Sequence, residues 1–218
     1  MNTVIVTGAA GYIGGTICIL LKRQGYNVIG VDRRKLPEHL KPYIDQYEQC
    51  CFTNPFSLQH VENKPKAIIH CAGTSLVGPS VANPEVYYDN NVAKTIQYLA
   101  HIRRHSPESK FIFSSSASVY GNPEIDFPLD EDFPTNPISP YGHSKLMVET
   151  ILDSYSKSYE LKYVSFRYFN ACGAVKGGLH GQEPGASHIF ARLFESIKNT
   201  DHFWLFGTDY DTPDGTCI

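Results

Sequence analysis

The sequence predicts an α/β protein built on a doubly wound parallel sheet, with a partial second lobe after it. Short apolar strands alternate with longer helical patterns through most of the chain. A glycine-rich turn joins the first strand to the first helix, and a later helix begins with a tyrosine and a lysine four residues apart. Strands that are apolar along their whole length belong in a parallel sheet covered by helices on both faces.

The expected elements follow from residue type and hydrophobic period. Strands are predicted at Thr3–Thr7, Asn27–Asp32, Glu48–Phe52, Lys66–Cys71, Lys110–Ser114 and Lys162–Arg167. Helices are predicted at Tyr12–Gln24, Pro84–His105 and Pro140–Tyr159. Gly25 ends the first helix just past its last turn, and Pro84 stands in the first turn of the second.

The alternation stops after about Phe169. The glycine-rich segment Gly173–Gly185 has no period, and a helix at Ser187–Lys198 and a strand at Phe203–Phe206 are predicted to follow it. We therefore expect a dinucleotide-binding domain over residues 1–169 and a partial, truncated substrate lobe over residues 170–218.

Composition narrows the class of protein. Hydrophobic residues make up 42% of the 218 residues and charged residues 19%, as in ordinary globular proteins. The net charge of −3 gives no electrostatic case for a nucleic-acid or membrane partner, and no signal peptide or membrane span is expected. Six cysteines without a C-x-x-C pair indicate free thiols in a reducing, cytoplasmic setting. His101 and His105 have a zinc-compatible spacing but no third ligand, so no metal site is predicted.

The turn after the first strand has the pattern G-x-x-G-x-x-G. Gly8 allows a tight turn, Gly11 has no side chain to keep a pyrophosphate away, and Gly14 lets the helix pack close to the sheet. The helix N-terminus can then hold phosphates with its N–H groups and the positive end of its dipole. This is the arrangement of a Rossmann dinucleotide site.

The residue that ends the second strand favours NAD over NADP. Asp32 lies some twenty residues after the glycine loop and can accept hydrogen bonds from the adenosine ribose. Arg33 and Arg34 follow at once, and either could meet a 2′-phosphate. Asp32 would repel that phosphate, so NAD is the expected cofactor.

Tyr141 and Lys145 stand at positions i and i+4 of a predicted helix and therefore share one face. A nearby ammonium favours the phenolate of a tyrosine, as does an oxidised nicotinamide, and together they could make Tyr141 a general base. The hydroxyls of Ser114–Ser116 close the fifth strand, at the edge of the sheet where ligands bind. They could hold a substrate hydroxyl beside the tyrosine.

These motifs together resemble the extended short-chain dehydrogenase/reductase family, and within it the NAD-dependent nucleotide-sugar epimerases, closest to the UDP-glucose 4-epimerases. The resemblance covers the whole chain and rests on six blocks. They are V-T-G-A-A-G-Y-I-G, Y-Y-D-N-N-V, S-S-S-A-S-V-Y-G, S-P-Y-G-H-S-K, R-Y-F-N and F-G-T-D-Y-D-T-P-D-G-T-C. It implies interconversion of UDP-glucose and UDP-galactose through transient oxidation at C4.

The resemblance also implies a role for each matching position. Tyr141 would be the base, Lys145 its partner and Ser116 the hydroxyl that orients the sugar. The residues expected at NAD are Gly8, Gly11, Tyr12, Ile13, Gly14, Asp32, Ala72, Gly73, Asn90, Ser114, Tyr141, Lys145 and Tyr168. Those expected at the UDP-sugar are Ser116, Tyr141, Asn170, His188, Ile189, Trp204 and Phe206.

The chain departs from the family pattern at several positions. Arg33, Arg34 and Lys35 replace asparagines and a serine, and Cys51 replaces an aspartate near the adenine. Ser75 stands where a lysine is common. The sequence stops where the family continues with an Arg-Asp-Tyr segment and the rest of its substrate lobe.

Alternative functions remain open at this level. One is an epimerase of another UDP-sugar. Another is a nucleotide-sugar 4,6-dehydratase, although Ala117 and Ser118 replace the Asp-Glu pair that dehydration requires. A third is a non-catalytic NAD-binding protein or inactive fragment. In the family, the helices equivalent to Pro84–His105 and Pro140–Tyr159 pair two subunits, so a homodimer is expected.

Overall fold

The computed structural model describes residues 2–53, 64–123, 128–183, 185, 188–199, 202–204 and 207–215. The chain divides into two compact units, Met1–Ala171 and Cys172–Ile218. The boundary between them lies two residues after the division expected at 169/170.

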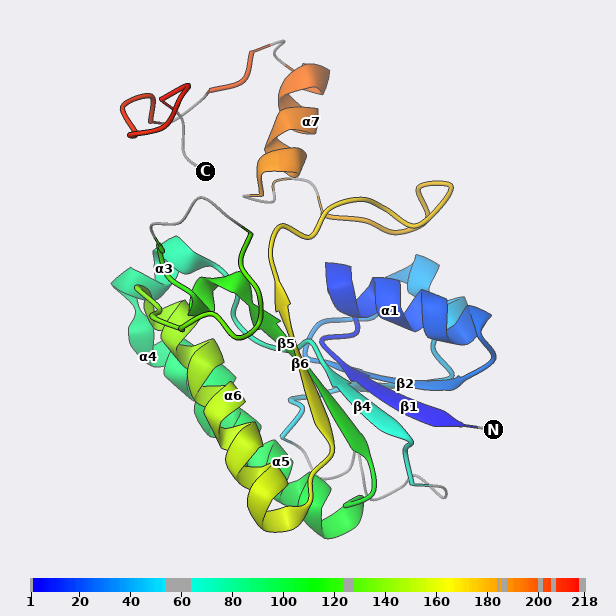
Figure 1. Cartoon of the computed structure of the whole chain (residues 1–218). Coiled ribbons are helices and arrows are strands. Elements are labelled where there is room, and N and C mark those ends of the chain that lie inside the picture. Colours follow the sequence, from blue (N-terminus) through cyan, green and yellow to red (C-terminus); the bar gives the residue numbers. More distant parts are fainter. Residues whose placement is uncertain are drawn as a thin grey trace. The chain divides into compact units, whose positions relative to one another are not determined.

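A six-stranded sheet forms the centre of the first unit, with the order β3-β2-β1-β4-β5-β6 (Figure 1). The strands are β1 Thr3–Thr7, β2 Asn27–Asp32, β3 Gln46–Gln49, β4 Ala67–His70, β5 Lys110–Ser116 and β6 Tyr163–Tyr168. Every neighbouring pair is parallel, which confirms the predicted doubly wound sheet. The strand order reverses between β1 and β4, and in such sheets ligands bind beyond the carboxyl ends of the strands at this point.

The third strand begins two residues before its predicted start and ends three residues before its predicted end. Its register pairs Ile29 with Gln46 and Asp32 with Gln49, so the ladder ends where β2 ends. The chain then turns inward, and Phe52 is buried in the core instead of extending the strand. The end of the neighbouring strand therefore determines where β3 stops.

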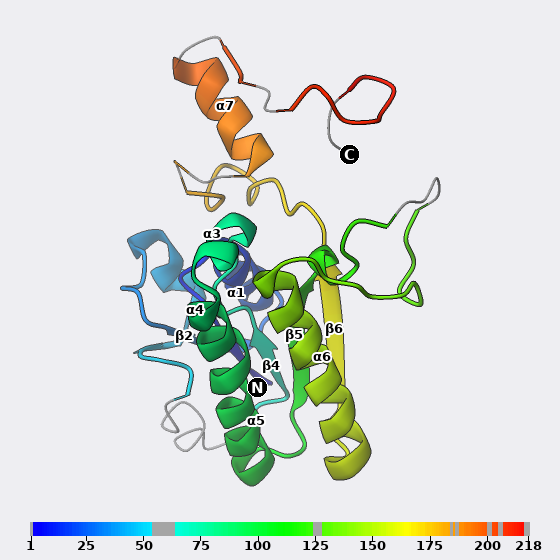
Figure 2. The same ribbon diagram turned by 90° about the vertical axis from the view of Figure 1, so that its left-hand side faces the viewer.

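Helices cover both faces of the sheet (Figures 1 and 2). The helix α1 (Tyr12–Arg23) packs on one face, together with the 3₁₀ helix η1 (Glu38–Tyr43). On the other face, α5 (Lys94–His105) and α6 (Pro140–Tyr159) lie side by side. The main core lies between the sheet and these two helices. It includes Ile5, Ile29, Ile68, Tyr98, Leu99, Ile102, Phe111, Phe113, Val148 and Leu152.

The helix predicted at Pro84–His105 consists of three consecutive segments. The α-helix α4 (Pro84–Tyr87) leads into the π-helical segment η2 (Tyr88–Ala93), which leads into α5. A π-helical segment is common at functional sites, and this one carries the asparagines of the Y-Y-D-N-N-V block. The short helices α3 (Val77–Ala82), η1 and η3 (Ala117–Val119) were not predicted.

Local interactions define both ends of α6. The hydroxyl of Ser139 accepts a hydrogen bond from the Gly142 N–H at 3.1 Å, and Pro140 occupies the first helical position. At the other end Glu160 adopts a left-handed conformation with φ of 58°. The N-terminal cap places Tyr141 in the first turn of the helix.

The second unit contains the helix α7 (Ile189–Asn199) and an isolated antiparallel bridge between Ala174 and Gly181. The helix lies close to its predicted range of Ser187–Lys198. The strand predicted at Phe203–Phe206 is wrong for its described residues, because Phe203 and Trp204 are not in a strand. Phe206 lies outside the described residues. Among the helices that the structure describes, none is long and apolar enough to cross a membrane.

Candidate functional site

The glycine loop follows β1 and lies between the end of β2 and the segment just after β4. Gly8 has a φ of 71°, and its N–H donates to the carbonyl oxygen of Val31 at 2.8 Å. A Cβ on Gly8 would lie 2.8 Å from the backbone nitrogen of Ala72, and one on Gly14 would lie 2.1 Å from the carbonyl oxygen of Gly8. Neither position accepts a side chain, so the close approach of helix, loop and sheet requires both glycines.

The N-terminus of α1 is suited to an anion. Its capping residue is Gly11, no side chain caps it, and its first turn, which includes Tyr12 and Ile13, contains no acidic residue. Beside it, the Asp32 carboxylate accepts hydrogen bonds from the N–H groups of Ala10 at 3.1 Å and Arg34 at 2.9 Å. A phosphate-binding helix end thus adjoins a carboxylate placed for a ribose, and these residues fit a dinucleotide.

The structure brings the predicted catalytic side chains together on α6 and β5. The Lys145 ammonium donates a hydrogen bond to the carbonyl oxygen of Ser114 at 2.8 Å. It lies 5.7 Å from the ring centre of Tyr141 and 4.9 Å from that of Phe113. Ser116 ends β5 and its hydroxyl interacts with the Tyr141 phenol. All of these side chains are buried.

Burial shifts the pKa of both Lys145 and Tyr141 on α6. It lowers the pKa of Lys145 to about 8, although Cys71 and Glu149 oppose that shift. Burial also raises the pKa of Tyr141, which the Ser116 hydroxyl opposes and Tyr87 reinforces. In the protein by itself, burial therefore favours the protonated phenol, although the Lys145 ammonium lies nearby. A further positive charge at the phenol is required.

The loop after β4 is tied to α6 by Asn91, which the sequence reasoning did not select. Its side-chain oxygen accepts from the Thr74 N–H at 2.8 Å, and its amide donates to Ser144 Oγ at 2.9 Å. The Ser144 hydroxyl donates in turn to the Tyr141 carbonyl oxygen at 2.7 Å. The predicted Asn90 makes one contact with this loop, from its amide to Thr74 Oγ1 at 3.2 Å. The sequence feature that could have identified Asn91 is its position in the Y-Y-D-N-N-V block.

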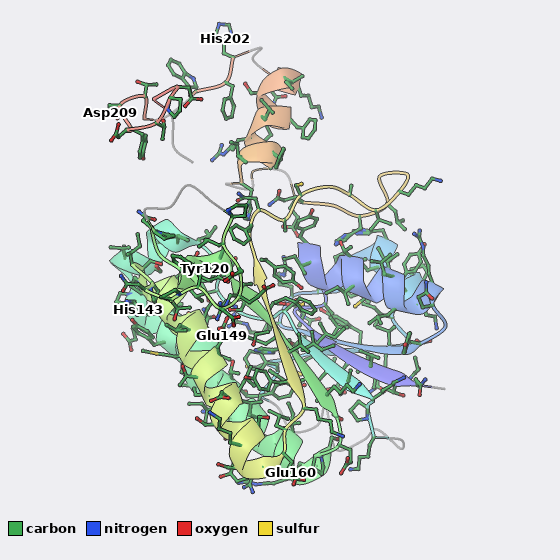
Figure 3. All side chains as sticks on the ribbon, in the orientation of Figure 1. Tyr120, His143, Glu149, Glu160, His202 and Asp209 are labelled. Carbon is green, nitrogen blue, oxygen red and sulfur yellow. The ribbon has the colours of Figure 1, made fainter. Side chains whose placement is uncertain are left out.

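An ion pair that was also missed joins α6 to β6. The Arg167 guanidinium donates to the Glu149 carboxylate, with Nη2 and Oε2 2.8 Å apart, and to the Tyr120 hydroxyl at 2.9 Å. Glu149 also accepts a hydrogen bond from the Ser115 hydroxyl at 2.5 Å. Figure 3 labels Glu149 and Tyr120. Glu149 is two helical turns beyond Tyr141, so this network fixes the helix against the two strands beside the site.

His70, at the end of β4, is a further residue that the sequence reasoning missed. Its ring nitrogens contact Thr7 Oγ1 at 2.7 Å and Thr95 Oγ1 at 3.2 Å. Burial, with a smaller contribution from the Lys145 charge, lowers the pKa of His70 to about 3. The neutral imidazole therefore supports the sheet directly beneath the loop that carries Ala72 and Gly73.

The other predicted site residues are divided between the two units. In the first unit, Tyr168 ends β6 and is half-buried, and Asn170 is exposed just after it. In the second unit, His188, Ile189 and Trp204 are exposed. His143, inside the tyrosine–lysine motif, is exposed on α6 (Figure 3).

The model of the NAD dependent epimerase/dehydratase family matches residues 4–216. The chain therefore belongs to this family. Among its relatives, the UDP-glucose 4-epimerase of Azospirillum brasilense is 38% identical over 99% of this chain and 63% of its own length. The chain thus spans less than two thirds of that enzyme.

Solved structures agree with the family assignment. The UDP-glucose 4-epimerase of Brucella ovis in complex with NAD has a TM-score of 0.89 and 35% identity, covering 100% of this chain and 67% of that one. The UDP-glucose 4-epimerase of Bifidobacterium longum in complex with NAD⁺ and UDP has a TM-score of 0.84 and 38% identity, covering 99% and 68%. These matches confirm the resemblance inferred from the sequence motifs.

Proposed function

We propose that this chain is an NAD-dependent nucleotide-sugar 4-epimerase that interconverts UDP-glucose and UDP-galactose. The observation that carries the proposal is the meeting of Tyr141, Lys145 and Ser116 at the carboxyl edge of the sheet. The glycine loop and Asp32 lie on the same edge of that sheet. The relatives named UDP-glucose 4-epimerase, some solved with NAD, support the choice of reaction.

In this mechanism the Tyr141 phenolate takes the proton of the sugar 4-hydroxyl, and Ser116 orients that hydroxyl. NAD, when bound, supplies the chemistry of accepting a hydride from C4 and returning it. Lys145 holds positive charge beside the phenol, which favours its ionised form. Tyr141 would return its proton to the sugar 4-oxygen once the keto sugar has turned and its opposite face has been reduced.

The pKa shifts indicate why the base is active only with cofactor. Burial raises the pKa of Tyr141 in the protein alone, so its proton is retained at neutral pH. The positive nicotinamide would add a second cation near the phenol and lower that pKa. Proton removal is thereby coupled to the presence of an oxidised cofactor. The other cofactor contacts proposed are those of Ala72, Gly73, Asn90, Ser114 and Tyr168.

The sugar nucleotide is proposed to meet Ser116, Tyr141, Asn170, His188, Ile189, Trp204 and Phe206. This set comes from the family resemblance, and the Bifidobacterium relative solved with UDP supports a UDP-containing ligand. The choice of UDP-glucose and UDP-galactose over another UDP-sugar rests on the same relatives.

Conversion of UDP-galactose to UDP-glucose by the purified chain, with and without added NAD, tests the proposal. We expect conversion by the wild type and a loss of at least ~100-fold in Tyr141→Phe, because general-base catalysis contributes about that much. His143→Ala is the matched control on the same turn of α6, since His143 is exposed, and it should retain activity. Conversion by Tyr141→Phe at the wild-type rate would refute the role of the phenol.

We also propose a homodimer formed through α4, η2, α5 and α6. An open apolar hollow of about 600 Å³ lies on these elements, lined by Glu85, Tyr88, Asp89, Val92, Ala93, Ile96 and Met147. The side chains of Val86, Ile96 and Met147 are exposed. Such a patch suits a subunit interface.

The free thiols of the described cysteines are consistent with a cytoplasmic location.

A further inference from the structure

Arg34 occupies an unusual place at the dinucleotide site. Its Nε lies 3.7 Å from Oδ1 of Asp32, the carboxylate placed for the adenosine ribose. A Cβ built on Gly11 would lie 3.1 Å from its Nη2, so the guanidinium reaches across to the glycine loop. The cation therefore lies between the ribose-binding carboxylate and the helix end that would hold the pyrophosphate.

The backbone holds this segment in place. The Tyr47 hydroxyl donates to the Arg34 carbonyl oxygen at 2.5 Å, and the Gln49 amide donates to that of Arg33 at 3.4 Å. The Arg34 N–H is bound to Asp32. These contacts hold the backbone of residues 33 and 34, and none of them involves the Arg34 side chain.

The charges of Asp32 and Arg34 determine whether this site can bind a dinucleotide with a 2′-phosphate. Asp32 alone would repel a phosphate on the ribose 2′-oxygen, and that repulsion is the physical basis of NAD preference. Here a guanidinium lies beside the same carboxylate, with half of its side-chain surface exposed (51%). A guanidinium offers several donors in a planar fork that suits phosphate oxygens. It can therefore offset the repulsion from Asp32.

We propose that Arg34 binds the 2′-phosphate of NADP, so that this chain accepts NADP as well as NAD. The inference rests on the proposed dinucleotide site and concerns its choice of cofactor. Asp32 keeps NAD the better ligand. Arg34 reduces the difference between the two dinucleotides to about tenfold, where one charge-assisted contact to phosphate is worth roughly 10- to 100-fold in affinity.

Calorimetric titration of the cofactor-free chain with NAD⁺ and with NADP⁺ tests this without any turnover. The wild type should bind NADP⁺ within about tenfold of NAD⁺. Arg34→Ala should weaken NADP⁺ binding roughly 10- to 100-fold and NAD⁺ binding less than about threefold. Arg34→Lys should recover part of the loss, because it retains the charge but not the planar fork.

Arg33→Ala and Lys35→Ala are the matched controls. Each removes the same charge from the same segment, so each should change NADP⁺ affinity less than about threefold. Equal losses in all three alanine variants would overturn the assignment, because they would show a general field effect. NADP⁺ binding more than ~100-fold weaker than NAD⁺ binding in the wild type would also overturn it. Absence of binding by both dinucleotides would instead refute the proposed cofactor site and this inference with it.

Discussion

At the scale of single residues, Lys145 shows how a functional group can reduce stability. Burial lowers its pKa from 10.5 to about 8, so the folded protein binds this proton less tightly than the unfolded chain. Burying the charge therefore costs stability below pH 8, and the cost disappears as pH rises from about 8 to 10.5. A site that keeps such a cation near a tyrosine accepts this cost for the sake of its chemistry.

Replacing Lys145 by methionine should stabilise the cofactor-free protein. The aliphatic stem is retained, while the desolvated charge and its hydrogen bond to Ser114 are lost. We expect a gain of roughly 1–3 kcal/mol at pH 7 that shrinks toward zero by pH 10.5. Urea unfolding at the two pH values measures it. A variant less stable than the wild type at pH 7 would contradict the prediction.

His70 links stability to pH with the same sign as Lys145, but in the acid range. Its pKa is lowered from 6.5 to about 3 by burial first and by Lys145 second, so the unfolded chain binds this proton and the folded protein does not. Stability from the neutral ring is complete above pH 6.5 and is lost as pH falls toward 3, at up to about 1.4 kcal/mol per pH unit. His70→Gln should lose this slope between pH 6.5 and 4.5 in urea titrations. An unchanged slope would show that other groups cause it.

Some residues of the site could be predicted from the sequence, and others could not. The spacing of Tyr141 and Lys145 and the place of Asp32 after β2 are local features, and the structure places these residues where the patterns indicated. Asn91 and His70 were missed because their roles depend on partners far away in sequence. Asn91 bonds Ser144 across 53 positions, a distance that no periodic pattern reports.

At the scale of elements, α6 depends on one ion pair more than on its other charges. The side chains of Glu149 and Arg167 are 12% and 19% exposed, and the pair joins α6 to β6. Burial of the charge raises its importance, because removal of one partner leaves the other charge poorly solvated. Removal of the Glu149 carboxylate also takes away the acceptor of the Ser115 hydroxyl. It leaves the Arg167 guanidinium, which donates to the Tyr120 hydroxyl, without its ion-pair partner.

Glu149→Gln should therefore lower the free energy of unfolding by about 2–4 kcal/mol. Asp153→Asn is the matched control on the same helix, because its partner Lys157 is 74% exposed, and it should cost less than about 0.5 kcal/mol. Thermal or urea unfolding gives both values. Similar losses in the two variants would contradict the special role of the Glu149 pair.

Elements were predicted well where the signal was local. The strands Thr3–Thr7 and Asn27–Asp32 match because each is an unbroken apolar run between clear turns. The third strand was displaced because its end depends on pairing with β2. The π-helical segment Tyr88–Ala93 lies inside a helix-like pattern and cannot be distinguished by period alone. Tertiary pairing thus explains the displaced strand, and the limits of the helical period explain the missed π-helical segment.

At the scale of the whole molecule, a parallel sheet, a glycine loop and a tyrosine–lysine helix meet in one site in the first unit. Conserving a hydride within that site is the property that separates an epimerase from a dehydrogenase that releases its product oxidised. The second unit is proposed to contribute the sugar-nucleotide contacts of His188, Ile189 and Trp204.

The proposed hydride transfer at C4 is tested with UDP-galactose carrying deuterium at C4 of the sugar. If the hydride leaves C4 and returns within one site, the UDP-glucose formed by the chain should retain the deuterium at C4, as read by NMR or mass spectrometry. Product that has exchanged the label for solvent hydrogen would contradict C4 hydride transfer. A chain that binds dinucleotide yet forms no UDP-glucose would contradict the proposed activity of this chain.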